Sequence, residues 1–307
     1  MTLDLTDRSS LTRFAWLSVA AALVTIGLKT AAWLMTGSVG LLSDAMESGV
    51  NLVGAVMALA MLTVAARPAD EDHAYGHSKA EYFSSGVEGS LILLAAIGIA
   101  IAAAERLMAP QPLEKVGLGL LVSVGASLVN LGVALVLLKK SKSAHSITLE
   151  ANAQHLLTDV WTSAGVIAGV GLVALTGWVR LDPLVAIGVA VNIVWTGVRI
   201  VRASVLGLMD TALPAAELAA VKAVLDRHAG ESGVQFHALR TRQSGARRFI
   251  SVHVLVPGMW TVQHGHQYLE RLEAEVRTVV PNCVIDTHLE SLDDPASWHD
   301  VGLDRKD

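Results

Sequence analysis

Six apolar segments, each long enough to cross a lipid bilayer, constrain the fold of this chain more than any other feature. A spanning helix needs about 20 mostly apolar residues, because the hydrocarbon core is about 30 Å thick and offers the backbone no hydrogen bonds. The segments run approximately over Phe14–Met35, Val39–Ala66, Tyr82–Met108, Val116–Leu138, Ile147–Val179 and Leu181–Leu208. We therefore predict an α-helical, multi-pass membrane domain with six transmembrane helices over residues 14–208.

The composition agrees with a membrane protein and excludes several other classes. Of the 307 residues, 52% are hydrophobic and 17% are charged, which is atypical of a soluble domain. The formal net charge of −5 is dispersed, so we expect no nucleic-acid partner. The single cysteine, Cys283, excludes an intramolecular disulfide and a cysteine-rich metal site. Residues 1–13 lack the apolar core of a signal peptide, and we expect a cytosolic N-terminal leader there.

The connections between the segments alternate in charge, which predicts the orientation of the chain in the membrane. Basic side chains gather on one side, where they are Arg8, Arg13, Arg67, Lys79, Lys139, Lys140, Lys142, Arg199 and Arg202. The opposite connections hold little beyond Arg106, Lys115 and Arg180. Because short loops rich in lysine and arginine stay on the cytoplasmic side, we expect both termini in the cytoplasm.

The fifth segment contains an ionisable pair, His155 and Asp159, four residues apart. On a helix this spacing places an imidazole and a carboxylate on one face, about one turn apart. Such groups are costly inside a membrane unless they face a partner, an ion or water, so a functional role is the default interpretation. Imidazole nitrogen and carboxylate oxygen together suit a divalent transition metal. The alternative is a pair near the helix end that reaches into the headgroups.

The second segment carries a matching polar face. Asp44, Glu47, Ser48 and Asn51 recur at helical spacing in an otherwise apolar stretch. Glu47 and Asn51 repeat the four-residue spacing of the fifth segment, so the two pairs can close a cage of four ligands. Asp44 lies near the external end, where it either joins this cage or only hydrates the helix end. Lys29 in the first segment is expected to pair with an acid or to snorkel outward, a structural rather than a transport role.

The connection between the second and third segments holds a candidate surface metal site. His73 and His77 are separated by a turn that contains Gly76, and Asp70 lies three residues upstream of His73. Two imidazoles and a carboxylate are common ligands of zinc-like ions. The alternative is a solvated acidic loop with incidental histidines.

The composition changes after Leu208, which predicts a separate cytosolic domain over residues 209–291 and a flexible tail over residues 292–307. Amphipathic helices are expected at Pro214–His228 and Val262–Val279, and alternating strands at Val234–Arg242, Arg247–Val256 and Val284–Glu290. The order αββαβ describes an open-faced α/β sandwich with helices on one side of a sheet.

This domain is unusually rich in histidine. Possible ligands, present without any cysteine-rich motif, are His237, His253, His264, His266, His288, Asp286 and Glu290. A single strand histidine usually just faces water, but so many in one small domain favour metal binding.

Taken in order, these motifs resemble the cation diffusion facilitator family, and in particular its bacterial zinc and ferrous-iron efflux branch. The matching stretches are Gly37–Glu47, Gly76–Glu81, His155–Asp159 and Leu239–Gly245. The resemblance extends over Leu11–Glu290, nearly the whole chain. It implies a homodimeric metal/proton antiporter of the bacterial inner membrane, with six transmembrane helices and a metallochaperone-like (ferredoxin-like) cytosolic domain.

The resemblance also implies site residues, position by position. The implied transport site consists of Glu47, Asn51, His155 and Asp159, with Asp44 nearby. The implied loop site consists of Asp70, His73 and His77. The implied cytosolic site consists of His237, His253, His266, His288 and Glu290, with His264 as an extra histidine. In the family, a charged pair matching Lys79 and Asp210 helps to hold the dimer at the membrane surface.

Two departures from the family pattern leave the transported metal open. Many relatives have aspartate or histidine where Glu47 stands, and aspartate where Asn51 stands; Asn51 offers only a neutral carbonyl oxygen. Several divalent ions suit such a nitrogen and oxygen site. The expected substrate and regulatory ligand is Zn²⁺, with Fe²⁺, Co²⁺, Cd²⁺, Ni²⁺ and Mn²⁺ as alternatives, and no organic cofactor is expected. A manganese-selective exporter of the same family is one alternative function.

Three other functions compete with metal export. A membrane metalloenzyme would need a catalytic motif such as His-Glu-x-x-His, which the sequence lacks, so we expect no enzymatic activity. A membrane-anchored metal sensor would make the polar residues of the spans dispensable. A channel is disfavoured, because a cage with an imidazole holds ions too tightly for rapid flow. No nucleotide-binding motif indicates a step driven by ATP.

Overall fold

The protein is described from a computed structural model of the 307-residue chain, which describes residues 9–36, 39–110, 116–178, 180–299 and 302. Some side chains within the helices also lie outside this description, among them those of Asp44, Glu47 and Asn51. The chain divides into two compact units, Thr6–Leu206 and Gly207–Asp307, and each unit is described by itself.

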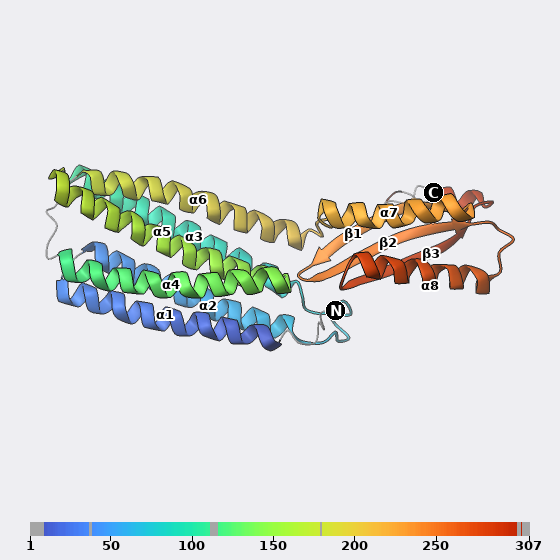
Figure 1. The fold of residues 1–307 in the computed structure, drawn as a ribbon, viewed down its shortest axis with the longest axis horizontal. Coiled ribbons are helices and arrows are strands. Elements are labelled where there is room, and N and C mark those ends of the chain that lie inside the picture. The colour runs from blue at the N-terminus through green and yellow to red at the C-terminus, as the bar shows by residue number, and fades with distance from the viewer. Residues whose placement is uncertain (1–8, 37–38, 111–115, 179, 300–301, 303–307) are drawn as a thin grey trace. The chain divides into compact units, whose positions relative to one another are not determined.

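The first unit is built from six long helices that run side by side (Figure 1). They are α1 Ser9–Thr36, α2 Val39–Ala65, α3 Ala80–Met108, α4 Val116–Ala144, α5 Ile147–Thr176 and α6 Leu181–Leu208. Their positions follow the six apolar segments, which confirms the predicted helical membrane domain. Within the described residues, four stretches are long and apolar enough to cross a membrane: Leu11–Ala31, Ala80–Met108, Leu120–Ala144 and Ala190–Leu208. The remaining helices, α2 and α5, carry the polar residues that the sequence singles out.

The bundle is apolar outside and partly polar inside, the reverse of a water-soluble domain. Large apolar side chains are exposed on its surface, for example Trp16, Leu94, Leu128, Val191 and Trp195. Polar side chains are buried between the helices, for example Ser18, Lys29, Asn130, Asn152 and Asp159. This arrangement satisfies polar groups internally and presents hydrocarbon to lipid, as a membrane span requires.

Small residues let the helices of the bundle approach closely. A Cβ added to Gly89 of α3 would lie 2.9 Å from Val201 Cγ2 of α6, and one added to Gly197 of α6 would lie 2.8 Å from Leu93 Cγ. Glycine is therefore required at both positions for the observed packing of α3 on α6, in keeping with the small residues found at membrane helix interfaces.

The second unit is a small α/β domain (Figure 1). Its elements are α7 Ala215–Ser232, β1 Gln235–Ser244, β2 Arg247–Val256, α8 Val262–Val279, β3 Cys283–Ser291 and the 3₁₀ helix η2 Pro295–Trp298. The sheet order is β1-β2-β3, with β1 antiparallel and β3 parallel to β2. The parallel pair needs a crossover connection, and α8 supplies it. The predicted αββαβ order is confirmed.

One face of the sheet packs against both helices. Alternate residues of β2, including Val252 and Val254, join Val224 of α7 and Leu272 and Val276 of α8 in a single buried core. Because strand side chains alternate between faces, the residues between them, such as His253, point to the opposite face. That opposite face carries the histidines discussed below.

The segment after β3 is more ordered than the sequence suggested. Residues 292–307 are expected to form a flexible tail, but the backbone N–H of Leu292 donates to the Val256 carbonyl at 2.9 Å. Asp294 then starts η2, because its Oδ1 accepts a hydrogen bond from the backbone N–H of Ala296 at 2.9 Å. Ser297 in this short helix is buried and donates to the Ser291 carbonyl. The described part of the tail is therefore packed on the domain.

Candidate metal sites

The strand register of the second unit brings three histidines together. His237 of β1 is the cross-strand neighbour of His253 of β2, which in turn is the neighbour of His288 of β3. Glu290 lies two residues after His288 and therefore on the same face of β3. A β-bulge follows His237, where Ala238 has a φ of 49° and the pairing shifts before Arg240.

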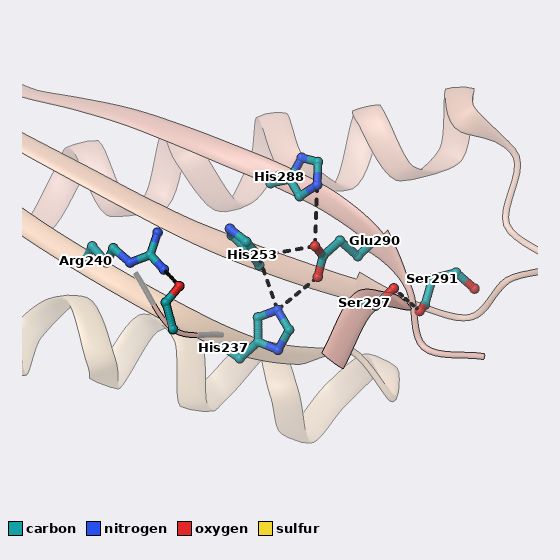
Figure 2. A network of polar contacts seen from close by, with 8 residues as sticks. His237, Arg240, His253, His288, Glu290, Ser291 and Ser297 are labelled. Atoms are coloured by element: carbon teal, nitrogen blue, oxygen red, sulfur yellow. Dashed lines mark hydrogen bonds and ion pairs between the residues drawn. The ribbon is translucent and has the colours of Figure 1, made fainter. Parts of the chain in front are cut away.

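Ligand atoms of three residues converge in this cluster (Figure 2). His237 Nε2 lies 2.9 Å from Glu290 Oε2 and 3.2 Å from His253 Nδ1, while His253 Nδ1 lies 3.2 Å from Glu290 Oε1. An ion bound tetrahedrally with bonds of about 2.0–2.1 Å keeps its ligand atoms about 3.3 Å apart. The two imidazole nitrogens and the carboxylate oxygens that they contact thus have nearly the spacing that a zinc-like ion requires. Their side chains are 11%, 13% and 6% exposed for His237, His253 and Glu290.

His288 lies at the open side of the same cluster. Its Nε2 is 3.4 Å from Glu290 Oε1, but its side chain is 65% exposed. Its ring centroid lies 5.0 Å from that of His253. His288 therefore contacts the carboxylate without being one of the three converging ligands.

The other predicted cytosolic ligands lie elsewhere. His264 and His266 are exposed residues of α8, which packs on the opposite face of the sheet through Tyr268 and Leu272. The ring of His264 instead contacts Trp260, at 4.3 Å between centroids. Within one chain, the structure does not bring either histidine to the cluster. It does add a residue that the sequence did not indicate, since the Trp298 ring lies edge-on to His237 with centroids 5.7 Å apart.

The loop between α2 and α3 forms the second group of candidate ligands. Asp70 Oδ1 lies 3.0 Å from His73 Nδ1, and Asp70 Oδ2 lies 3.3 Å from His77 Nε2. The backbone N–H of His73 also donates to Asp70 Oδ1 at 2.7 Å, which fixes the turn. Desolvation raises the pKa of Asp70, but hydrogen bonds from His73 and the charges of His77 and His73 bring it below its usual value. Asp70 and His73 are exposed, so this site is open to water.

In the membrane unit, both members of the α5 pair are buried. His155 is 5% exposed and Asp159 is 1% exposed. Neither ring nitrogen of His155 has a hydrogen-bond partner among the residues that the structure describes. The predicted partners on α2, namely Asp44, Glu47 and Asn51, have side chains outside the description. The cage itself therefore stays a prediction, while the burial of its α5 half is observed.

Asp159 is held by side chains from two other helices. Lys29 Nζ of α1 lies 3.0 Å from Asp159 Oδ1 and 3.1 Å from Oδ2, and the Asn130 amide of α4 donates to Oδ2. The expectation that Lys29 pairs with an acid is thus confirmed, and the acid is a candidate transport ligand. Asn130 was missed, although a lone amide in the apolar fourth segment was a visible signal.

Glu88 of α3 was also missed. It is 1% exposed, and neither carboxylate oxygen has a hydrogen-bond partner among the described side chains. A Cβ added to Gly54 of α2 would lie 3.6 Å from Glu88 Cγ, so the acid packs against α2. An acidic residue in a membrane helix is costly without a functional or structural reason.

The predicted dimer pair involves residues of both units. Asp210 has a φ of 58° and its Oδ1 forms an ion pair with Arg242 Nη1 at 3.2 Å, inside the second unit. Lys79 belongs to the first unit and directly precedes α3. The pairing of Lys79 with Asp210 therefore stays a prediction.

Comparisons with known proteins agree with this architecture. The model of the cation efflux transmembrane domain matches residues 15–209, and that of the cytoplasmic domain of cation efflux proteins matches residues 213–292. The uncharacterized transporter sll1263 of Synechocystis sp. is 50% identical over 285 residues, which cover 93% of this chain and 92% of that protein. The cation-efflux pump FieF of Pectobacterium atrosepticum is 30% identical over 271 residues, 88% and 89% of the two chains. FieF of Salmonella arizonae is 29% identical over 276 residues, 90% and 91% of the two chains. With both of its units matched in order, the chain belongs to the cation diffusion facilitator family of cation efflux proteins.

Proposed function

We infer that this protein exports a divalent metal cation, foremost Zn²⁺, from the cytoplasm across the bacterial inner membrane in exchange for protons. One observation carries this inference. A buried histidine with no hydrogen-bond partner among the described residues, His155, lies one helical turn from a buried carboxylate, Asp159, inside an apolar bundle. An imidazole in such a place needs a ligand, and a divalent metal is the ligand that this pair of donors suits.

The exchange of metal for protons follows from the chemistry of these donors. Metal binding requires an unprotonated imidazole at His155 and ionised carboxylates at Asp159 and Glu47. Protons compete for the same atoms, so proton entry from outside favours release of the metal there. Alternating exposure of the site to the two sides of the membrane then couples the two fluxes, as in other secondary transporters. Ferrous iron and manganese are the main alternatives to zinc.

The cytosolic cluster fits a regulatory metal site. Glu290 contacts His237 at 2.9 Å and His253 at 3.2 Å. A bound ion can take the place of these contacts by forming one bond to each of the three side chains. The domain also carries the family's dimer-forming cytoplasmic fold, so we expect a homodimer with both termini in the cytoplasm. Occupancy of the cluster would favour one arrangement of the two domains and thereby change transport.

The main alternative to metal export is a membrane-anchored metal sensor, which makes a testable claim about the membrane helices. A sensor would use the spans only as an anchor, and their polar residues would be dispensable. The buried polar side chains Lys29, Asn130, His155 and Asp159 favour transport, because burying several polar groups in a mere anchor has a cost without a benefit.

Proteoliposomes loaded with a zinc-sensitive dye and a pH dye test the proposal. The unaltered protein is expected to move zinc one way and protons the other, and His155→Ala should lose both fluxes while remaining folded. His299→Ala is the matched control, since His299 is an exposed histidine outside every proposed site. Unchanged zinc flux in a well-folded His155→Ala protein would move the transport site away from α5.

A further inference from the structure

The Asp159 carboxylate is already occupied by a cation that belongs to the chain. Lys29 Nζ contacts both carboxylate oxygens, at 3.0 Å and 3.1 Å, and the two side chains are 0% and 1% exposed. The amide of Asn130 adds a donor to Oδ2. Asp159 therefore has no oxygen that is free of a donor, although it is one of the residues expected to hold the metal.

We propose, on the basis of the proposed export function, that Lys29 is a tethered cation that alternates with the transported metal on Asp159. In the empty site the ammonium holds the carboxylate, and an incoming divalent ion displaces it. Lys29 thus acts on transport through Asp159 and is a positioning residue that need not touch the metal.

The energetics of buried charge explain why an empty transporter would need such a group. An unpaired carboxylate inside a membrane bundle is strongly unfavourable, and removing one member of a buried ion pair is far more costly than keeping both. With Lys29 in place, the empty Asp159 site carries no uncompensated charge. The protein can therefore return to its starting orientation without a metal in this half of the site.

The structure also indicates which donor gives way to the metal. Lys29 is a compact charge on a flexible four-carbon stem, so its ammonium can withdraw along the stem without movement of α1. Asn130 is neutral and does not repel a cation, so it can keep its hydrogen bond to Oδ2. A tethered monovalent cation favours divalent over monovalent ions, because only an ion of higher charge gains from replacing it.

Substitutions that weaken and strengthen this competitor should act in opposite directions. Lys29→Met removes the charge at similar length and should tighten zinc binding at this site by at least about tenfold, since a unit charge this close to a ligand is worth more than a tenfold change. It should also lower the maximal rate of export. Lys29→Arg supplies a two-pronged partner for the carboxylate and should raise the KM for zinc.

Zinc binding to the transport site is measured on the full-length protein by calorimetry, as the difference from Asp159→Asn, which retains the loop and cytosolic sites. Export is measured in proteoliposomes. A Kd for Lys29→Met that is equal to or weaker than that of the unaltered protein overturns the proposal, as does an unchanged KM in Lys29→Arg. The Arg variant keeps the buried charge pair and decides the question even where Lys29→Met does not fold.

The alternative of a purely structural ion pair has its own signature. The neutral double variant Lys29→Met/Asp159→Asn would then regain export, because a static pair can be replaced by groups without charge. Under the proposal it folds but does not export, since Asp159 is a ligand. If the unaltered protein moves neither zinc nor another divalent metal, the proposed export function fails. If the unaltered protein does export metal but the Lys29 variants behave as expected for a static ion pair, only the inference about Lys29 fails.

Discussion

Glu290 is the residue on which the cytosolic cluster depends, and its replacement gives a sharp test. Its carboxylate contacts His237, His253 and His288 at 2.9 Å, 3.2 Å and 3.4 Å. Glu290→Gln keeps the shape but removes the charge and leaves one oxygen as a ligand. Residues that only support a ligand are typically worth 10–100-fold in metal affinity. Loss of a direct anionic ligand should therefore weaken zinc binding to the cluster by at least about 100-fold, or about 2.8 kcal/mol.

That loss can be read as a change in the stability of the domain. Zinc at about 1,000 times the Kd of the unaltered cluster stabilises the folded domain by about 4.1 kcal/mol. For a cluster that binds about 100-fold more weakly, the same zinc concentration gives only about 1.4 kcal/mol. Chemical denaturation of the full-length protein with and without zinc measures this difference, and hydrogen exchange of the cytosolic-domain amides serves as the readout of unfolding.

The control for this experiment is Glu270→Gln, which makes the same change at an exposed position of α8. It should leave the zinc-dependent stabilisation unaltered. Equal stabilisation by zinc in the Glu290 and Glu270 variants would refute the assignment of the cluster as a metal site.

Three further predictions concern the loop and the membrane unit. Because the pKa of Asp70 is lowered, its hydrogen bond from His73 should persist at mildly acidic pH and be lost as the pH falls through that lowered value, measured by exchange of the His73 amide. Glu88→Gln should reduce zinc export by more than tenfold in proteoliposomes without unfolding the protein; full export would leave Glu88 a packing residue. Gly89→Val should lower the free energy of unfolding by about 1–3 kcal/mol through overpacking against α6, whereas Gly98→Val, with open space around it, should not, as thermal unfolding would show.

The sequence predicted the elements of this fold well because their patterns are local. Runs of apolar residues and strict alternation depend only on neighbours along the chain, so all six apolar segments and all three strands of the second unit appear where expected. The exception is η2, which depends on one side-chain cap at Asp294 and on packing of Ser297 that no repeating pattern announces.

The sites were harder to predict because they depend on register. The sequence offered seven candidate acidic or imidazole ligands in the domain with little to rank them, and only the pairing of β1, β2 and β3 selects His237, His253 and Glu290 over His264 and His266. The partner of Lys29 in the membrane unit was hard to predict for a similar reason. Lys29 and Asp159 are 130 residues apart, so their contact follows from the packing of α1 near α5 rather than from spacing.

The contact between Trp298 and His237 gives the protein an optical probe of its own cytosolic cluster. An indole 5.7 Å from an imidazole changes its fluorescence when that ring gains a proton or a metal. The other tryptophan of the domain, Trp260, packs against His264 and Tyr268 away from the cluster and provides an internal reference. The emission that is lost on a Trp298→Phe change therefore reports the state of His237 without any attached dye.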